Sequence, residues 1–135
     1  MEALIAGWTA GFAMALVSTA TLVYLLVGHE DAPFVRLLLP EQLPPAIAAV
    51  PISVAMMLGW PLVGLLFGGG FALFGPEDGD SPVPSVPYLI GIVATGLVPL
   101  VFLMLFWPRR WWLWTGMTAV FVALFGVAMP LLATR

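Results

Sequence analysis

The charged residues of this chain stand at the ends of four long stretches that contain none. The uncharged stretches are residues 3–28, 46–74, 86–107 and 111–133. Each is longer than the roughly 20 apolar residues that a helix needs to cross about 30 Å of hydrocarbon. They are apolar on every side, whereas the strands of a membrane β-barrel alternate apolar and polar residues. The pattern therefore predicts four membrane-spanning helices.

The composition excludes a soluble domain and a disordered chain alike. Of the 135 residues, 62% are hydrophobic and 8% are charged, whereas an ordinary soluble domain has about a quarter charged residues. In lipid, backbone N–H and C=O groups must bond within the chain, and a helix meets this demand within each segment. We therefore predict an all-α, polytopic integral membrane protein. Residues 1–135 are expected to form a single membrane domain, a compact bundle of four transmembrane helices.

Arginine positions predict how the chain is oriented in the membrane. With four crossings, the two termini and the second loop share one side, and the first and third loops share the other. Arg36, Arg109 and Arg110 lie on the second of these sides, against Arg135 on the first. Because basic residues in short loops favour the cytoplasm, we expect both termini outside it. The chain has no lysine, which with its acidic loops suits a GC-rich or salt-adapted source, and we expect a prokaryotic cell membrane.

The first loop contains signals for a short helix. Asp31 is suited to an N-cap and Pro33 to an early helical turn. Such a helix would lie in the membrane interface, with the leucines at 37–39 at the acyl boundary. The alternative is an irregular loop that covers the end of the bundle. The second loop, residues 75–85, is acidic and rich in proline and glycine, which is typical of a solvated connector.

The third loop allows no more than a tight reversal, so residues 86–107 and 111–133 must form an antiparallel hairpin. Tryptophans surround two arginines at this reversal, which is a composition typical of a membrane surface. Two uses are open: plain anchoring at the lipid interface, or binding of an anionic lipid headgroup or an acidic partner loop by the arginines. The residues are Trp107, Arg109, Arg110, Trp111, Trp112 and Trp114.

Small residues recur at helical spacing in three of the spans, where they permit close approach of helix backbones. These faces either hold the four helices to one another or contact another subunit. For an outside contact the pair in the first span is the best candidate, because a long loop joins that helix to its neighbour. The residues are Gly7 and Gly11 in the first span, Gly64 and Gly68 in the second, and Ala119, Ala123 and Gly126 in the fourth.

Pro61 and Pro99 lie near the middles of the second and third spans, where each removes a backbone hydrogen bond. Glycines near Pro61 make residues 46–74 the most deformable span. We interpret the two prolines as hinge candidates. They either form static kinks or mark the place where a cavity opens.

Residues that carry chemistry are missing from the spans. Ionisable groups inside a membrane usually mark proton relays, ion paths or counter-ions, and the four stretches contain none. The chain has no cysteine, and its one histidine, His29, lies just beyond the first span. The hydroxyl groups of the spans have no base in their own segments, and no glycine-rich segment has the lysine of a phosphate-binding loop. We therefore predict no catalytic, cofactor-binding or metal-binding residue and no enzymatic activity.

These observations favour a structural or accessory subunit of a larger membrane complex, acting through helix packing and lipid contacts. The expected partners are membrane lipids and other membrane subunits, or further copies of the chain, and not nucleic acid. The alternative is a small oligomeric transporter or channel without a titrating membrane residue. A membrane enzyme is a poor third hypothesis, because the arginines and the acidic second loop lie on opposite sides.

Overall fold

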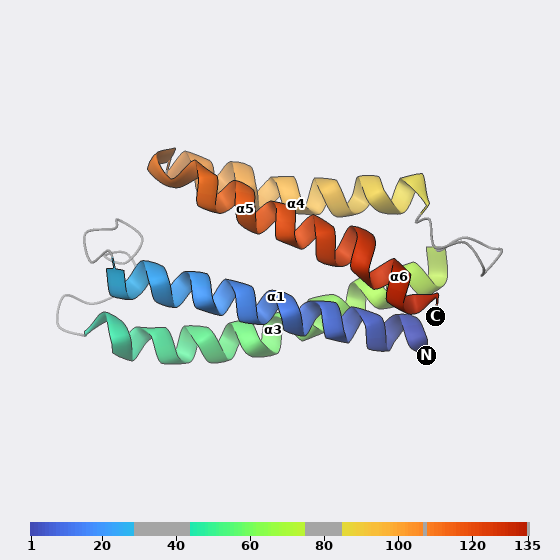
Figure 1. Cartoon of the computed structure of the whole chain (residues 1–135), viewed down its shortest axis with the longest axis horizontal. Helices are drawn as coiled ribbons and strands as arrows, with labels where there is room; N and C mark the ends of the chain where they lie inside the picture. Colours follow the sequence, from blue (N-terminus) through green and yellow to red (C-terminus); the bar gives the residue numbers. More distant parts are fainter. Residues whose placement is uncertain (29–43, 75–84, 107, 135) are drawn as a thin grey trace.

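The computed structural model describes residues 1–28, 44–74, 85–106 and 108–134, and these ranges are helical with no strand. The predicted all-α bundle of four apolar helices is confirmed. A 3-10 turn, η1 (Pro108–Arg110), precedes the last span, which consists of three consecutive pieces. The elements are α1 (Glu2–Gly28), α3 (Pro45–Phe74), α4 (Val86–Phe106) and, for the last span, α5 (Trp111–Val122), the π-helix η2 (Ala123–Ala128) and α6 (Met129–Ala133) (Figure 1).

Three of these helical segments are long and apolar enough to cross a bilayer, namely Glu2–Leu25, Ala49–Phe74 and Trp111–Ala133. By the same measure α4 is a shorter apolar helix, with Val86–Val98 as its described apolar stretch. The helices end close to the boundaries that the charge pattern predicts. The predicted first-loop helix, with Asp31 and Pro33, lies outside the described residues.

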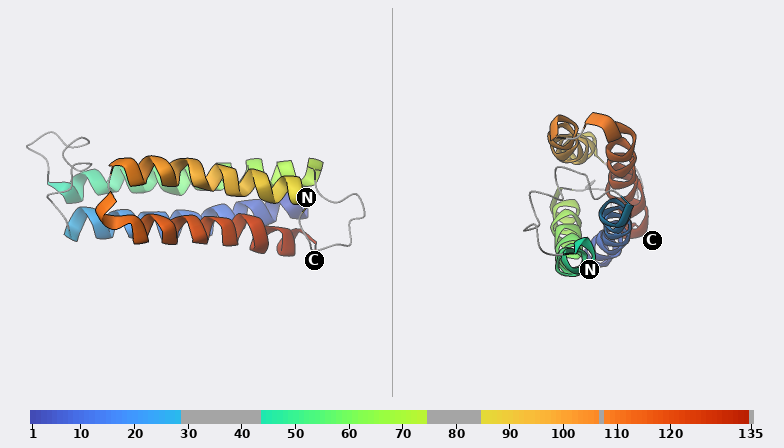
Figure 2. Two further views of the ribbon diagram at one scale, coloured as in Figure 1. Left: turned by 90° about the horizontal axis from the view of Figure 1, so that it is seen from above. Right: turned by 90° about the vertical axis from the view of Figure 1, so that its left-hand side faces the viewer.

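The helices run antiparallel and form two pairs. α1 packs along α3, α4 packs against α5, and η2 and α6 bring the last span back onto α1. Both termini lie at one end of the bundle, and η1 lies at the other (Figure 1). Seen along the bundle axis, α3 and α4 occupy one side and α1 and the last span the other (Figure 2). The pairs meet at the end near the termini and separate towards η1.

Glycines determine how closely α1 and α3 approach each other. A Cβ added to Gly7 would collide with the carbonyl oxygen of Gly64 and lie 3.0 Å from the Cα of Gly68. The relationship is reciprocal, because a Cβ on Gly64 would collide with the Gly7 carbonyl and lie 3.1 Å from the Cα of Gly11. Each glycine instead points a Cα hydrogen at a carbonyl of the facing helix, which is the geometry of a weak Cα–H···O bond. We call these four residues the glycine seam.

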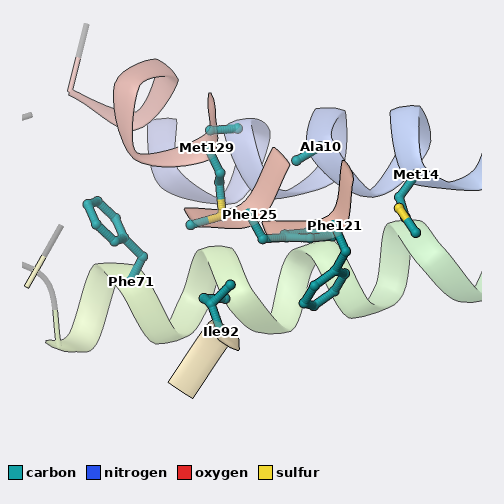
Figure 3. Close-up of a cluster of buried hydrophobic side chains, with 8 residues drawn as sticks. Ala10, Met14, Phe71, Ile92, Phe121, Phe125 and Met129 are labelled. Carbon is teal, nitrogen blue, oxygen red and sulfur yellow. The ribbon is translucent and has the colours of Figure 1, made fainter. Parts of the chain in front are cut away.

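Aromatic rings fill part of the space between the two helix pairs. Phe121 and Phe125 of the last span lie 5.0 Å apart between ring centroids, and Phe67 of α3 lies 5.9 Å and 5.1 Å from them. Phe125 and Met129 have no exposed surface, and they project between α1 and α3 (Figure 3). Such ring pairs contribute about 0.5–1.5 kcal/mol beyond their buried area. This cluster holds the last span against the α1–α3 pair.

The π-helix leaves one buried carbonyl without a backbone donor, and Tyr88 supplies the missing bond. In η2 the Met129 N–H donates to the carbonyl of Leu124, five residues earlier. The Phe125 carbonyl would take its bond from residue 130 in this register, but Pro130 has no N–H. The Tyr88 hydroxyl of α4 donates to that carbonyl at 2.8 Å. The bond ties α4 to the last span where an orphaned carbonyl in lipid would be costly.

Candidate functional site

A cleft of about 540 Å³ lies between the two helix pairs, on the side where they separate. Its floor is formed by side chains that are buried, among them Met14, Trp114 and Phe121. Its rim is formed by residues that are exposed, Leu66 on α3 and Thr95 on α4. The cleft therefore opens sideways between α3 and α4, towards the surroundings of the bundle. This cleft is the candidate functional site.

All four spans contribute to the cleft, which is lined almost entirely by apolar groups. Trp60 forms part of one wall, and its ring lies tilted against that of Phe121 with the ring centroids 6.0 Å apart. The full lining consists of Met14 from α1, Trp60, Val63, Leu66 and Phe67 from α3, Thr95, Gly96 and Leu100 from α4, and Trp114, Met117, Thr118 and Phe121 from α5.

The two hydroxyl groups of the lining already have acceptors within their own helices. The Thr95 hydroxyl donates to the Gly91 carbonyl at 2.7 Å, and the Thr118 hydroxyl donates to the Trp114 carbonyl at 3.0 Å. Each hydroxyl proton is thus committed to the backbone. The cleft offers its occupant methyl, methylene and ring surfaces, which suit a hydrocarbon better than a polar solute.

The tryptophans and arginines of the η1 end divide between surface and interior. Arg109, Trp111 and Trp112 are exposed, as anchoring at a membrane surface requires. Trp114, by contrast, is buried at 7% exposure and lines the cleft, so the structure does not place it at the surface of the bundle. At 100° per residue, Trp114 is turned about 200° from Trp112 and therefore faces the bundle interior. Trp107 lies outside the described residues.

The seven predicted packing residues also divide. Gly7, Gly11, Gly64 and Gly68 are buried against one another in the glycine seam, so the first pair is not available to another subunit.

In the last span, Gly126 is buried, and a Cβ there would lie 3.6 Å from Leu89 and 3.8 Å from Ile92 of α4. Ala119 and Ala123 are exposed instead. The three residues therefore do not form one packing face within the bundle, and contact of Ala119 and Ala123 with another subunit stays a prediction. The wider turn of the π-helix changes the register after residue 123 and separates Gly126 from the two alanines.

The hinge candidates lie in unbroken helices. α3 continues through Pro61, which is buried with its Cα 2.8 Å from the position of a Cβ on Gly11. α4 continues through Pro99. Pro61 packs against α1 beside the glycine seam, and this packing supports the interpretation of Pro61 as a static kink.

A cavity near Pro61 and Pro99 was one of the two interpretations of the hinge candidates, and Trp60 and Leu100, next to these prolines, line the cleft. The other lining residues and the Tyr88 bond were not predicted from the sequence. One signal for the cleft wall is the spacing of Trp60, Val63 and Phe67, which places these three side chains on one face of α3. A signal for the bond is a tyrosine near the start of one span together with Pro130 near the end of another. Neither signal is specific, because aromatic residues and prolines are frequent throughout this chain.

Among the described residues, no group of three histidine, cysteine, aspartate or glutamate side chains could hold a metal ion. Comparison of the chain with models of protein families, with curated proteins and with solved structures finds no match. The fold and composition therefore define the class of protein on their own. It is a small all-α protein whose long apolar helices are compatible with integration into a membrane.

Proposed function

We propose that this chain is a non-catalytic accessory subunit of a membrane protein complex and that the outer face of α3 binds its partner. The observation that carries the proposal is how little of α3 the rest of the bundle covers. In its most apolar stretch 11% of the residues are buried, against 39% in the corresponding stretch of α1. The glycine seam attaches one side of α3 to α1 and leaves the opposite side open.

Glycines on this open side have no packing role within the bundle. A Cβ added to Gly59 or Gly70 would meet no atom within 4 Å. Eleven residues separate the two glycines, or about three helical turns, so they lie on the same face. Leu62, Leu66 and Leu73 lie on that face too, and each is more than half exposed. We call these five residues the α3 outer face.

Outward glycines are informative because small residues let a neighbouring helix come close in a membrane. The seam shows this use within the chain, where α3 glycines receive the backbone of α1. On the outer face, Gly59 and Gly70 form hollows and the leucines form ridges, which is the surface that ridges-into-grooves packing requires. We infer that a second membrane helix packs there.

The same proposal includes an orientation. The positive-inside rule applied to Arg109 and Arg110 at the η1 end supports a cytoplasmic location for that end. Both termini, which lie together at the other end (Figure 1), would then lie outside the cytoplasm of a prokaryotic cell.

The test is native mass spectrometry after gentle extraction of the tagged protein from its own membranes. We expect a complex that contains one or more other membrane proteins. Gly59→Leu and Gly70→Leu should each release the partner by filling a hollow of the α3 outer face. Gly91→Leu is the matched control, because Gly91 on α4 is equally open, with no atom within 4 Å of an added Cβ.

Two results would overturn the proposal. The first is a protein that emerges by itself or as a homo-oligomer from native membranes. The second is equal loss of the partner from the Gly91→Leu control, which would show that the α3 outer face has no special part. The apolar lining of the cleft does not favour the transporter alternative, because a pathway for polar solutes needs polar groups along it.

A further inference from the structure

The size of the cleft limits what can occupy it. An α-helix with its side chains is about 10–12 Å wide, so a volume of about 540 Å³ admits less than two turns of one. A methylene group takes about the volume of a water molecule in the liquid, roughly 30 Å³. The size of the cleft is therefore on the order of one fatty acyl chain.

The distance along the last span from Arg110 to the floor of the cleft agrees with the thickness of one leaflet of a bilayer. Its α5 wall extends from Trp114, one turn after Arg110, to Phe121. The rise from Arg110 to Phe121 is about 16 Å, and half of the hydrocarbon core is about 15 Å thick. An acyl chain that entered at the η1 end would reach the floor of the cleft near the bilayer midplane.

A basic group lies where the headgroup of such a lipid would be. Arg109 is exposed at the η1 end, beside the exposed rings of Trp111 and Trp112. An arginine guanidinium can donate two hydrogen bonds to one phosphate group. The apolar cleft and the arginine are thus arranged in the order of an acyl chain and its headgroup.

We infer that the cleft binds one acyl chain of an anionic phospholipid from the leaflet at the η1 end, with its phosphate at Arg109. This inference goes beyond the proposed subunit role and does not depend on it. The lipid fills the opening that Leu66 of α3 and Thr95 of α4 border. Leu66 borders both the cleft and the α3 outer face, so a partner helix on that face would lie beside the bound acyl chain.

The test measures lipid retained by the purified protein in native mass spectrometry, after reconstitution with phosphatidylglycerol or phosphatidylcholine. We expect one phosphatidylglycerol retained per chain. Thr95→Phe places a ring at the rim of the cleft and should lower retention about tenfold. Val93→Phe adds the same ring to α4 at a residue that does not line the cleft, and should leave retention unchanged.

The headgroup contact has its own variant. Arg109→Gln should remove the preference for phosphatidylglycerol over phosphatidylcholine while the acyl chain still enters the cleft. Equal retention by Thr95→Phe and Val93→Phe would overturn the acyl site. Equal retention of the two lipids by the unaltered protein would overturn the role of Arg109.

A second measurement needs no variant and therefore does not depend on the folding of one. The unaltered protein is irradiated in vesicles that contain phosphatidylglycerol with a photoreactive diazirine in its acyl chain. Peptide mapping should find the adducts on cleft residues such as Val63, Leu100 and Met117. Adducts confined to outward residues such as Leu58 and Leu105, which do not line the cleft, would contradict the inference.

Discussion

The hydroxyl of Tyr88 donates a hydrogen bond to the carbonyl oxygen of Phe125 across the interface between α4 and the last span, at 2.8 Å. The same hydroxyl lies 3.7 Å from the sulfur of Met129. Its partner carbonyl lies inside a π-helix, and Pro130 cannot supply the backbone donor that the π register would use. Tyr88 and Pro130, which are 42 residues apart in the sequence, thus act together in the packing of the last span.

Tyr88→Phe should destabilise the protein by about 1 kcal/mol, because it leaves the Phe125 carbonyl without a donor. The measurement is the free energy of unfolding in mixed micelles with increasing denaturing detergent. Pro130→Ala restores an N–H at residue 130, so Tyr88→Phe should lower the free energy of unfolding by less in that background. Equal costs in both backgrounds would contradict the account of the orphaned carbonyl.

Gly64→Ala should separate α1 from α3 and destabilise the protein by about 1–3 kcal/mol, the usual range for overpacking. The added methyl meets backbone atoms of Gly7 and Gly11, which cannot move aside as a side chain can. The same unfolding measurement applies. Gly91→Ala is the control, since its methyl would enter open space and should cause no loss. A stable Gly64→Ala protein would show that the seam is looser than described.

Phe125→Ala should cost about 3–5 kcal/mol, since the ring has no exposed surface and its loss leaves a cavity among packed rings. Leu62→Ala should cost less than about 0.5 kcal/mol in the purified protein, because Leu62 is 58% exposed. Unfolding curves of the two variants give the comparison. Similar costs would argue against a core centred on Phe121 and Phe125.

Single cysteines can test the arrangement of the chain ends, because the sequence contains no cysteine. Glu2→Cys and Thr134→Cys should react with an impermeant maleimide from one side of the membrane, and Arg109→Cys from the other. The expectation follows from the two termini at one end of the bundle and η1 at the other (Figure 1). In intact cells, the proposed orientation predicts labelling at residues 2 and 134. Labelling of all three positions from the same side would exclude the odd number of crossings that the fold places between residue 109 and each terminus.

The charge pattern predicts the helices well because each stretch forms a helix for reasons that lie within that stretch. Each of the stretches 3–28, 46–74, 86–107 and 111–133 is long and apolar, and a helix satisfies its own backbone. The pattern could not predict which face of each helix turns inward. A span that is apolar on every side gives no contrast between a lipid-facing and a protein-facing residue, so Gly59 and Gly64 look alike in the sequence.

The sequence by itself determined a helical chain with uncharged spans and an arginine-containing reversal between the third and fourth, because length and polarity act along the chain. The tertiary structure decided which small residues meet. It placed Gly7 on Gly64 and left Gly59, Gly70, Ala119 and Ala123 outside.

The tertiary structure also turned Trp114 away from the surface and into a cleft between the helix pairs. It paired Tyr88 with the carbonyl that Pro130 leaves without a donor. These relationships depend on steric fit and hydrogen-bond geometry between helices distant in sequence, and neither hydropathy nor charge encodes them.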